Sequence, residues 1–161
     1  MKPAIIYTSY TGTTHAVAQK IHDACGGDLI EVKSWDLLSR LFMYFVRRSP
    51  DMQVRDDGVP PMAIDLSGYD LVVIGTPVWM GKPTMAIQKT IAALTGCNGK
   101  PVILFATCGE DPGTTLPVLS GEVKTKGMTV AGRFSLSQKE IADGAVIRDL
   151  IANVQGFGGG Q

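Results

Sequence analysis

Two short, continuously apolar runs constrain the fold of this chain more than any other feature. They are residues 69–75 (YDLVVIG) and 101–107 (PVILFAT), and neither shows the apolar–polar alternation of a strand with one face in water. A strand that is apolar on both sides belongs in a sheet that is covered on both faces. Because amphipathic segments separate such runs along the chain, the sequence predicts parallel strands joined by right-handed helical crossovers.

The same reasoning predicts the order of the elements. Strands are expected at residues 3–9, 29–33, 69–75, 101–107 and 128–136. Helices are expected at residues 13–25, 36–48, 83–94, 114–126 and 138–154, the fourth interrupted by Pro117 and Gly121. Residues 49–61 are polar and contain prolines, which predicts a loop. The sequence therefore predicts one α/β domain over residues 1–155 and a flexible, glycine-rich tail at 156–161.

Charge and cysteine content exclude several classes of protein. Lys+Arg and Asp+Glu both number 15 among 161 residues, so the net charge is +0, whereas nucleic-acid binders usually carry a basic excess. Three scattered cysteines form no disulfide framework and no C-x-x-C zinc pair. No apolar run approaches the roughly 18 residues of a membrane span, and the short apolar run at residues 3–7 is not expected to act as a secretory signal. We expect a soluble, cytoplasmic protein.

Ligands of open parallel sheets bind outside the carboxyl ends of the strands, and the first loop there is rich in hydroxyl groups. It consists of Ser9, Tyr10, Thr11, Gly12, Thr13 and Thr14. The loop runs straight into a helix, whose first N–H groups can bind a phosphate together with the hydroxyls. An ordinary Ser/Thr helix cap is the alternative, although it needs only one or two hydroxyls.

The second loop, residues 75–83, offers an aromatic ring and excludes nucleotide triphosphate hydrolysis. Five residues separate its two glycines, and Pro83 stands where a P-loop needs Ser or Thr for magnesium. Trp79 lies between turn residues at the end of a strand, which favours a stacking role over a place in the core.

The third loop, residues 107–114, offers backbone groups to a ligand. Cys108 could be a nucleophile, but a phosphatase-type loop needs Arg six residues later, where Thr114 stands, so a small buried thiol is the preferred interpretation. The N–H and C=O groups of this glycine-containing turn can bind a flat heterocycle. Together the three loops predict a site for a mononucleotide with a flat ring.

At this point the sequence resembles the flavodoxin family. Residues 5–21 match the family's N-terminal signature at every specified position, from Ile5-Ile6-Tyr7 through Ser9, Gly12 and Thr14 to Ala18 and Ile21. YDLVVIGTPVW and FATCGEDPG resemble the second and third flavin loops. The resemblance implies a three-layer sandwich with a five-stranded parallel sheet in the order 2-1-3-4-5, and FMN as cofactor. It assigns the phosphate to the first loop, the flavin ring to Thr76, Pro77, Val78, Trp79, Met80 and Gly81, and the pyrimidine side to Thr107, Cys108, Gly109 and Glu110.

Three differences from typical flavodoxins bear on the role of the protein. The third loop has Pro112, Gly113 and Thr114 in the stretch after Cys108-Gly109 where flavodoxins usually have a second aromatic residue. The chain is neutral, and Met80 separates Trp79 from Gly81. An electron-transfer flavoprotein is the first hypothesis, with a protein or a small molecule as acceptor. The second is an NAD(P)H- or protein-dependent reductase of a quinone-like acceptor, and the third is a non-redox binding module. The sequence leaves open whether the chain forms a homodimer.

Other sites are disfavoured. His15 and His22 have Cα atoms about 10 Å apart on the first predicted helix, too far for one metal ion. No G-x-G-x-x-G follows the first strand, which excludes a dinucleotide fingerprint. Residues 36–52 carry an apolar stripe, which either faces the core or forms a partly exposed surface beside the flavin.

Overall fold

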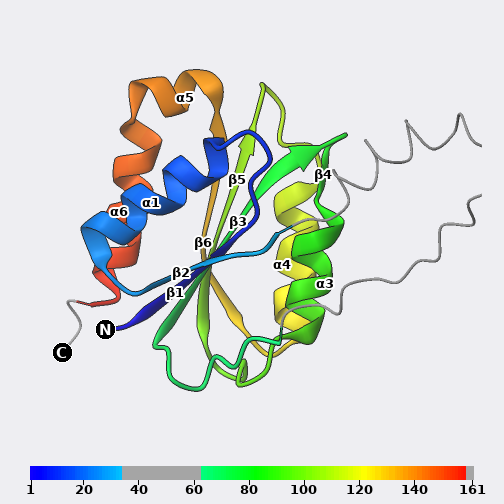
Figure 1. Ribbon diagram of the computed structural model, residues 1–161, viewed down its shortest axis with the longest axis vertical. Helices are drawn as coiled ribbons and strands as arrows, with labels where there is room; N and C mark the ends of the chain where they lie inside the picture. The colour runs from blue at the N-terminus through cyan, green and yellow to red at the C-terminus, as the bar shows by residue number, and fades with distance from the viewer. Residues whose placement is uncertain (34–62, 159–161) are drawn as a thin grey trace, which may run out of the picture.

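The computed structural model describes residues 1–33 and 63–158, and it shows a mainly parallel sheet between two layers of helices (Figure 1). The five long strands lie in the order β2-β1-β3-β5-β6, and all pair in parallel. This confirms the predicted order 2-1-3-4-5. A sixth strand, β4, was not predicted; it has two residues and pairs antiparallel with the end of β3.

The boundaries of most elements agree with the sequence to within two or three residues. The strands are β1 (Pro3–Tyr7), β2 (Asp28–Glu31), β3 (Leu71–Trp79), β4 (Lys82–Pro83), β5 (Pro101–Cys108) and β6 (Thr129–Ser137). The helices are α1 (Thr13–Cys25), α3 (Met85–Ala93), α4 (Thr115–Thr125), α5 (Gln138–Asp143) and α6 (Ala145–Gly156). The largest difference is β3, which runs four residues beyond the predicted end.

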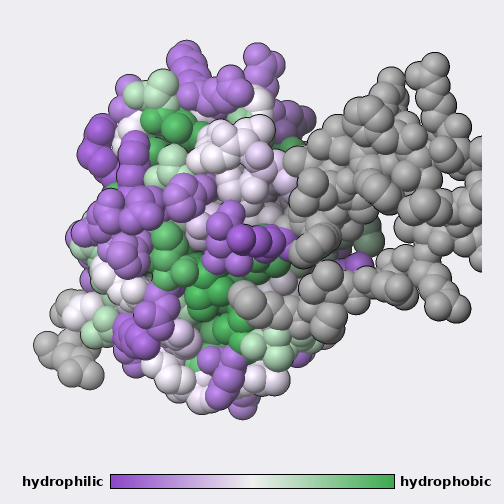
Figure 2. All heavy atoms as spheres, viewed as in Figure 1, coloured by the Kyte–Doolittle hydropathy of each residue, from purple (hydrophilic) through white to green (hydrophobic). Residues whose placement is uncertain are grey.

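Two apolar clusters, one on each face of the sheet, hold the layers together. Residues of α1 and α6 pack on one face around the fully buried Phe105, and residues of α3 and α4 pack on the other face around Leu104. Figure 1 shows α1, α5 and α6 on one side of the sheet and α3 and α4 on the other. Figure 2 shows hydrophilic residues over much of the outer surface, with apolar residues gathered in the middle of the view, near β1 and β2.

Two helix predictions need correction. The helix predicted at residues 138–154 is two helices, because Gly144 has φ 77, a left-handed conformation that ends α5. Conversely, α4 is not interrupted at Pro117 or Gly121. Pro117 lies in the first turn of α4, where the backbone N–H that proline lacks would have no intrahelical partner in any case.

Several predictions fall outside the described residues. These are the helix at 36–48, the loop at 49–61 and the apolar stripe at 36–52. The same holds for residues 159–161 of the predicted tail, so the flexible tail stays a prediction, while Gly156 is the last residue of α6. Within residues 1–33 and 63–158, no helix combines the length and apolar character needed to cross a membrane.

An ion cluster at the amino ends of the strands makes stability depend on pH. The Asp28 carboxylate accepts a hydrogen bond from the Tyr69 hydroxyl at 2.6 Å and lies 2.9 Å from Lys2 Nζ. The bond from Tyr69, followed by that from Lys2, holds the pKa of Asp28 below its ordinary value. The stability that Asp28 contributes is therefore present above about pH 4, the carboxyl's range in the unfolded chain, and is lost as pH falls through the lower folded value.

We therefore expect Asp28→Asn to be less stable than the wild type at pH 7, with a smaller difference at pH 3. Urea midpoints at the two pH values measure this. An equal difference at both pH values would show that the carboxylate charge contributes nothing.

Candidate functional site

The three loops singled out in the sequence follow β1, β3 and β5, three neighbouring strands of the sheet. Because these strands are parallel, the three segments gather at their carboxyl ends, which lie at the upper edge of the sheet in Figure 1, although the second segment begins inside β3. One contact joins each pair of loops: Thr14 to Thr107, Tyr10 to Trp79, and Gly81 to Thr114. The sequence-predicted site is thus one connected region.

The first loop leaves the start of α1 without a cap. The N-cap residue is Gly12, with φ 88, no side chain accepts a hydrogen bond from the first turn, and the first turn has no acidic residue. Ser9 Oγ instead accepts from the Gly12 N–H at 3.1 Å, which closes the loop on itself. The predicted alternative, a Ser/Thr cap of this helix, is therefore wrong. The N–H groups and the positive end of the helix dipole are left for an anion.

Thr14 lies deeper than the other hydroxyls of the first loop. Its side chain is buried, and Oγ1 lies 2.8 Å from Oγ1 of Thr107, at the end of β5. Thr11 and Thr13, by contrast, are 3.2 Å apart at the surface. A hydroxyl group has one hydrogen and two acceptor lone pairs, so Thr14 can accept from Thr107 and still donate to a ligand.

The second loop is mostly not a loop. Residues 75–79 continue β3, and Met80 and Gly81 form a two-residue turn into β4. Both turn residues have positive φ, 50 and 74, as a type I′ hairpin requires. The prediction that the strand ends at Gly75 and a loop begins there was therefore wrong. Gly75 lies inside β3, and a glycine is needed there because the ring of Phe105 occupies the space that a side chain would fill.

The hairpin presents Trp79 at the edge of the sheet and Met80 to solvent. The ring centroids of Trp79 and Tyr10 are 4.7 Å apart with an interplanar angle of 39°, so the first two loops meet through aromatic side chains. Met80 is 96% exposed. The Thr76 hydroxyl is buried and accepts from the Thr84 N–H at 3.3 Å, so its side chain supports the start of α3.

The third loop combines a protonated thiol with an exposed backbone. Burial, followed by the charges of Glu140 and Asp111, raises the pKa of the half-buried Cys108. A thiol with a raised pKa is a poor nucleophile, which disfavours the nucleophile alternative, although Cys108 is only partly buried and not fully buried as predicted. Gly109 and Glu110 are exposed, so the backbone of this turn is accessible to a ligand.

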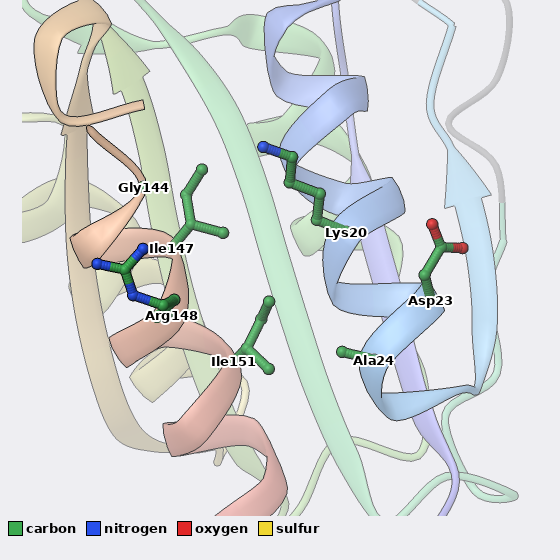
Figure 3. A pocket seen from close by; sticks show the side chains of 7 residues that line it. All are labelled: Lys20, Asp23, Ala24, Gly144, Ile147, Arg148 and Ile151. Atoms are coloured by element: carbon green, nitrogen blue, oxygen red, sulfur yellow. The ribbon is translucent and has the colours of Figure 1, made fainter. Parts of the chain in front are cut away.

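A separate hollow of about 470 Å³ lies between α1 and α6. Figure 3 shows Ile147 and Ile151 of α6 opposite Lys20 and Ala24 of α1. None of its lining residues belongs to the three loops, so this hollow is not part of the candidate site.

Sequence reasoning missed two contacts of the site. Tyr7 is buried, and its hydroxyl lies 2.6 Å from Nδ1 of His15, in the first turn of α1. Thr114 and Gly113 contact the hairpin turn at Gly81. The sequence WMGK carries only a weak hairpin signal, since asparagine or aspartate usually precedes the glycine of such a turn.

The fold and the joined segments define an α/β domain whose candidate site lies at the carboxyl edge of a doubly covered sheet. Residues 2–120 match the family model described as flavodoxin, and the chain belongs to the flavodoxin family. No curated protein sequence matches it.

Solved structures share this fold. A flavoprotein in complex with FMN from Lactobacillus acidophilus is 23% identical, with a TM-score of 0.56 over 88% of this chain and 97% of that chain. The two-electron reduced flavodoxin of Megasphaera elsdenii is 19% identical, with a TM-score of 0.59 over 95% and 98%. General stress protein 14 of Treponema denticola, in complex with FMN, is 13% identical, with a TM-score of 0.60 over 98% and 99%. At these identities the likeness establishes the fold.

Proposed function

We propose that the chain binds FMN non-covalently at the three loops and transfers electrons through it. The observation that carries this proposal is the start of α1, which has neither a side-chain cap nor an acidic residue and lies beneath a loop of hydroxyls. An FMN phosphate supplies the negative charge that the first turn lacks, and its oxygens accept hydrogen bonds from the N–H groups there. Membership of the flavodoxin family supports the same cofactor.

Each loop then has its own part in binding. The loop of Ser9, Tyr10, Thr11, Gly12, Thr13 and Thr14 binds the phosphate through its hydroxyls and the first N–H groups of α1. Trp79 packs beside the flavin ring. The same side of the flavin site is lined by Pro77, Val78, Met80 and Gly81, and the buried Thr76 side chain supports this segment from the core. The backbone of Cys108, Gly109 and Glu110 contacts the pyrimidine side, and Thr107 anchors Thr14. Bound flavin supplies the electron chemistry, so no side chain of the protein has to act as acid or base.

The proposed role is that of an electron carrier in the cytoplasm. All three cysteines are free thiols, which suits a reducing compartment. The acceptor is a partner protein or a small molecule that reaches the flavin beside Met80.

A reductase of a quinone-like acceptor is the second candidate, and one observation favours it. Residues 108–114 contain no aromatic side chain, and Met80 projects into solvent, so no ring of the third loop covers the flavin. A flat acceptor can then stack on the uncovered face. Turnover of NAD(P)H with a quinone would support the reductase, whereas reduction without turnover of any small acceptor would support the carrier.

Cofactor binding is tested with purified protein and added FMN. We expect a yellow protein whose free energy of unfolding rises by about 2.7 kcal/mol when FMN is present at 100 times its Kd. Thermal or urea unfolding with and without FMN measures the change. A protein that stays colourless and is not stabilised by micromolar FMN would instead be the non-redox module.

A further inference from the structure

The turn of the β3–β4 hairpin is fastened to the third loop through a single carbonyl group. The Gly81 carbonyl accepts a hydrogen bond from the Thr114 N–H at 2.8 Å and a second from Thr114 Oγ1 at 3.1 Å. Thr114 stands at the start of α4, but its side chain does not cap that helix. Its hydroxyl is therefore committed to the hairpin turn, 33 residues away in the sequence.

Gly113 brings the two backbones into direct contact. A Cβ at Gly113 would lie 2.5 Å from both the Cα and the carbonyl oxygen of Gly81, closer than real Cβ atoms approach other atoms. Gly113 also has φ 55, and its N–H donates to Asp111 Oδ1 at 2.8 Å, which fixes the turn that presents Thr114. We call these contacts of Gly81 with Gly113 and Thr114 the clasp.

The hairpin turn depends on the clasp for its conformation. Met80 holds a positive φ of 50, which costs a non-glycine residue free energy, and its 96% exposed side chain gains little packing in return. Trp79 directly precedes this turn and pairs with Lys82 across it. A turn that relaxes would therefore displace the Trp79 ring.

We propose that Thr114 and Gly113 are positioning residues, which hold Trp79 in place for the flavin ring by locking the hairpin turn to the third loop. This inference rests on the proposed binding of FMN. Because the clasp acts at the ring end of the site, its loss weakens binding of FMN and of riboflavin, which lacks the phosphate, by the same factor. Neither Gly113 nor Thr114 belongs to the loop that binds the phosphate, and both contact the hairpin turn at Gly81.

The test compares Thr114→Val, which removes the hydroxyl with little change in shape, with Thr114→Ser, which keeps it. The loss of one net hydrogen bond predicts affinity about 2- to 12-fold weaker in Thr114→Val for both FMN and riboflavin. We also expect a changed visible circular dichroism spectrum of the bound flavin and a shifted midpoint potential. Thr114→Ser should restore all three properties.

Gly113→Ala is tested beside a matched control. Gly99 also has a positive φ, 74, but a Cβ there meets nothing within 4 Å, and it lies at the amino end of β5. Gly99→Ala thus carries similar backbone strain without touching the clasp. We expect weaker flavin binding and an altered dichroism spectrum in Gly113→Ala alone.

Three results would overturn the clasp: wild-type affinity and spectrum in Thr114→Val, no rescue by Thr114→Ser, or equal loss of binding in Gly113→Ala and Gly99→Ala. If Gly113→Ala fails to fold, the comparison of Thr114→Val with Thr114→Ser still tests the proposal, because Thr114 is exposed and its substitution should leave the fold intact. Failure of the wild type to bind FMN would instead reject the proposed function, so the two failures are distinguishable.

Discussion

Replacing Gly75 with alanine is expected to lower the free energy of unfolding by about 1–3 kcal/mol, the usual cost of an overpacked core, or somewhat more. The new methyl group would overlap the ring of Phe105, with Cε2 only 2.7 Å away and two further ring carbons nearer still. Phe105 is fully buried between β3, α1 and α6, so its ring has little room to move. The loss is a large part of the 5–15 kcal/mol that stabilises an ordinary domain.

Urea unfolding measures this loss, and Gly121→Ala provides a control of opposite sign. Gly121 lies in α4, and a Cβ there meets nothing within 4 Å, so alanine should stabilise the helix by about 0.5–1 kcal/mol. In the double variant Gly75→Ala/Phe105→Leu, the smaller side chain makes room for the methyl group. Its loss should therefore be smaller than the sum of the two single losses. Additive losses would contradict the steric explanation.

Gly75 also shows why the sequence misplaced the second loop. A glycine followed by Thr-Pro at the end of an apolar run has the composition of a turn. In the folded chain the glycine is needed because a ring from the neighbouring strand β5 crosses it, and Gly75 and Phe105 are paired in register. Local sequence carries no information on that neighbour, so the strand was predicted to end four residues early.

The arrangement of layers, by contrast, was predictable from local patterns. Continuous apolar runs require a doubly covered sheet, and the handedness of crossovers leaves few strand orders. The contacts that join the loops were not predictable in the same way. Thr14 and Thr107 are 93 residues apart, and their contact depends on how α1 packs across the end of β5. The sequence therefore located three segments that meet at the carboxyl edge of the sheet, and the fold determines how they contact one another.

Replacing Thr14 with alanine is expected to weaken FMN binding by about 10- to 150-fold. The phosphate loop has no lysine or arginine, so each hydroxyl that donates to the phosphate makes a charge-assisted bond worth about 1.5–3 kcal/mol. In the structure Thr14 Oγ1 contacts Thr107 Oγ1 at 2.8 Å. If Thr107 donates in this pair, the Thr14 hydrogen is left for the phosphate.

Two comparisons separate direct binding by Thr14 from a merely supporting role. Riboflavin has no phosphate, so its affinity should be about the same in the wild type and in Thr14→Ala. Thr107→Val removes the same buried hydrogen bond but leaves the Thr14 hydroxyl free to donate, so it should weaken FMN binding less than Thr14→Ala does. Titration of the apoprotein with each flavin, followed by flavin fluorescence, measures these affinities. Equal loss of FMN and riboflavin binding in Thr14→Ala, or equal loss of FMN binding in Thr107→Val, would show that Thr14 only joins α1 to β5.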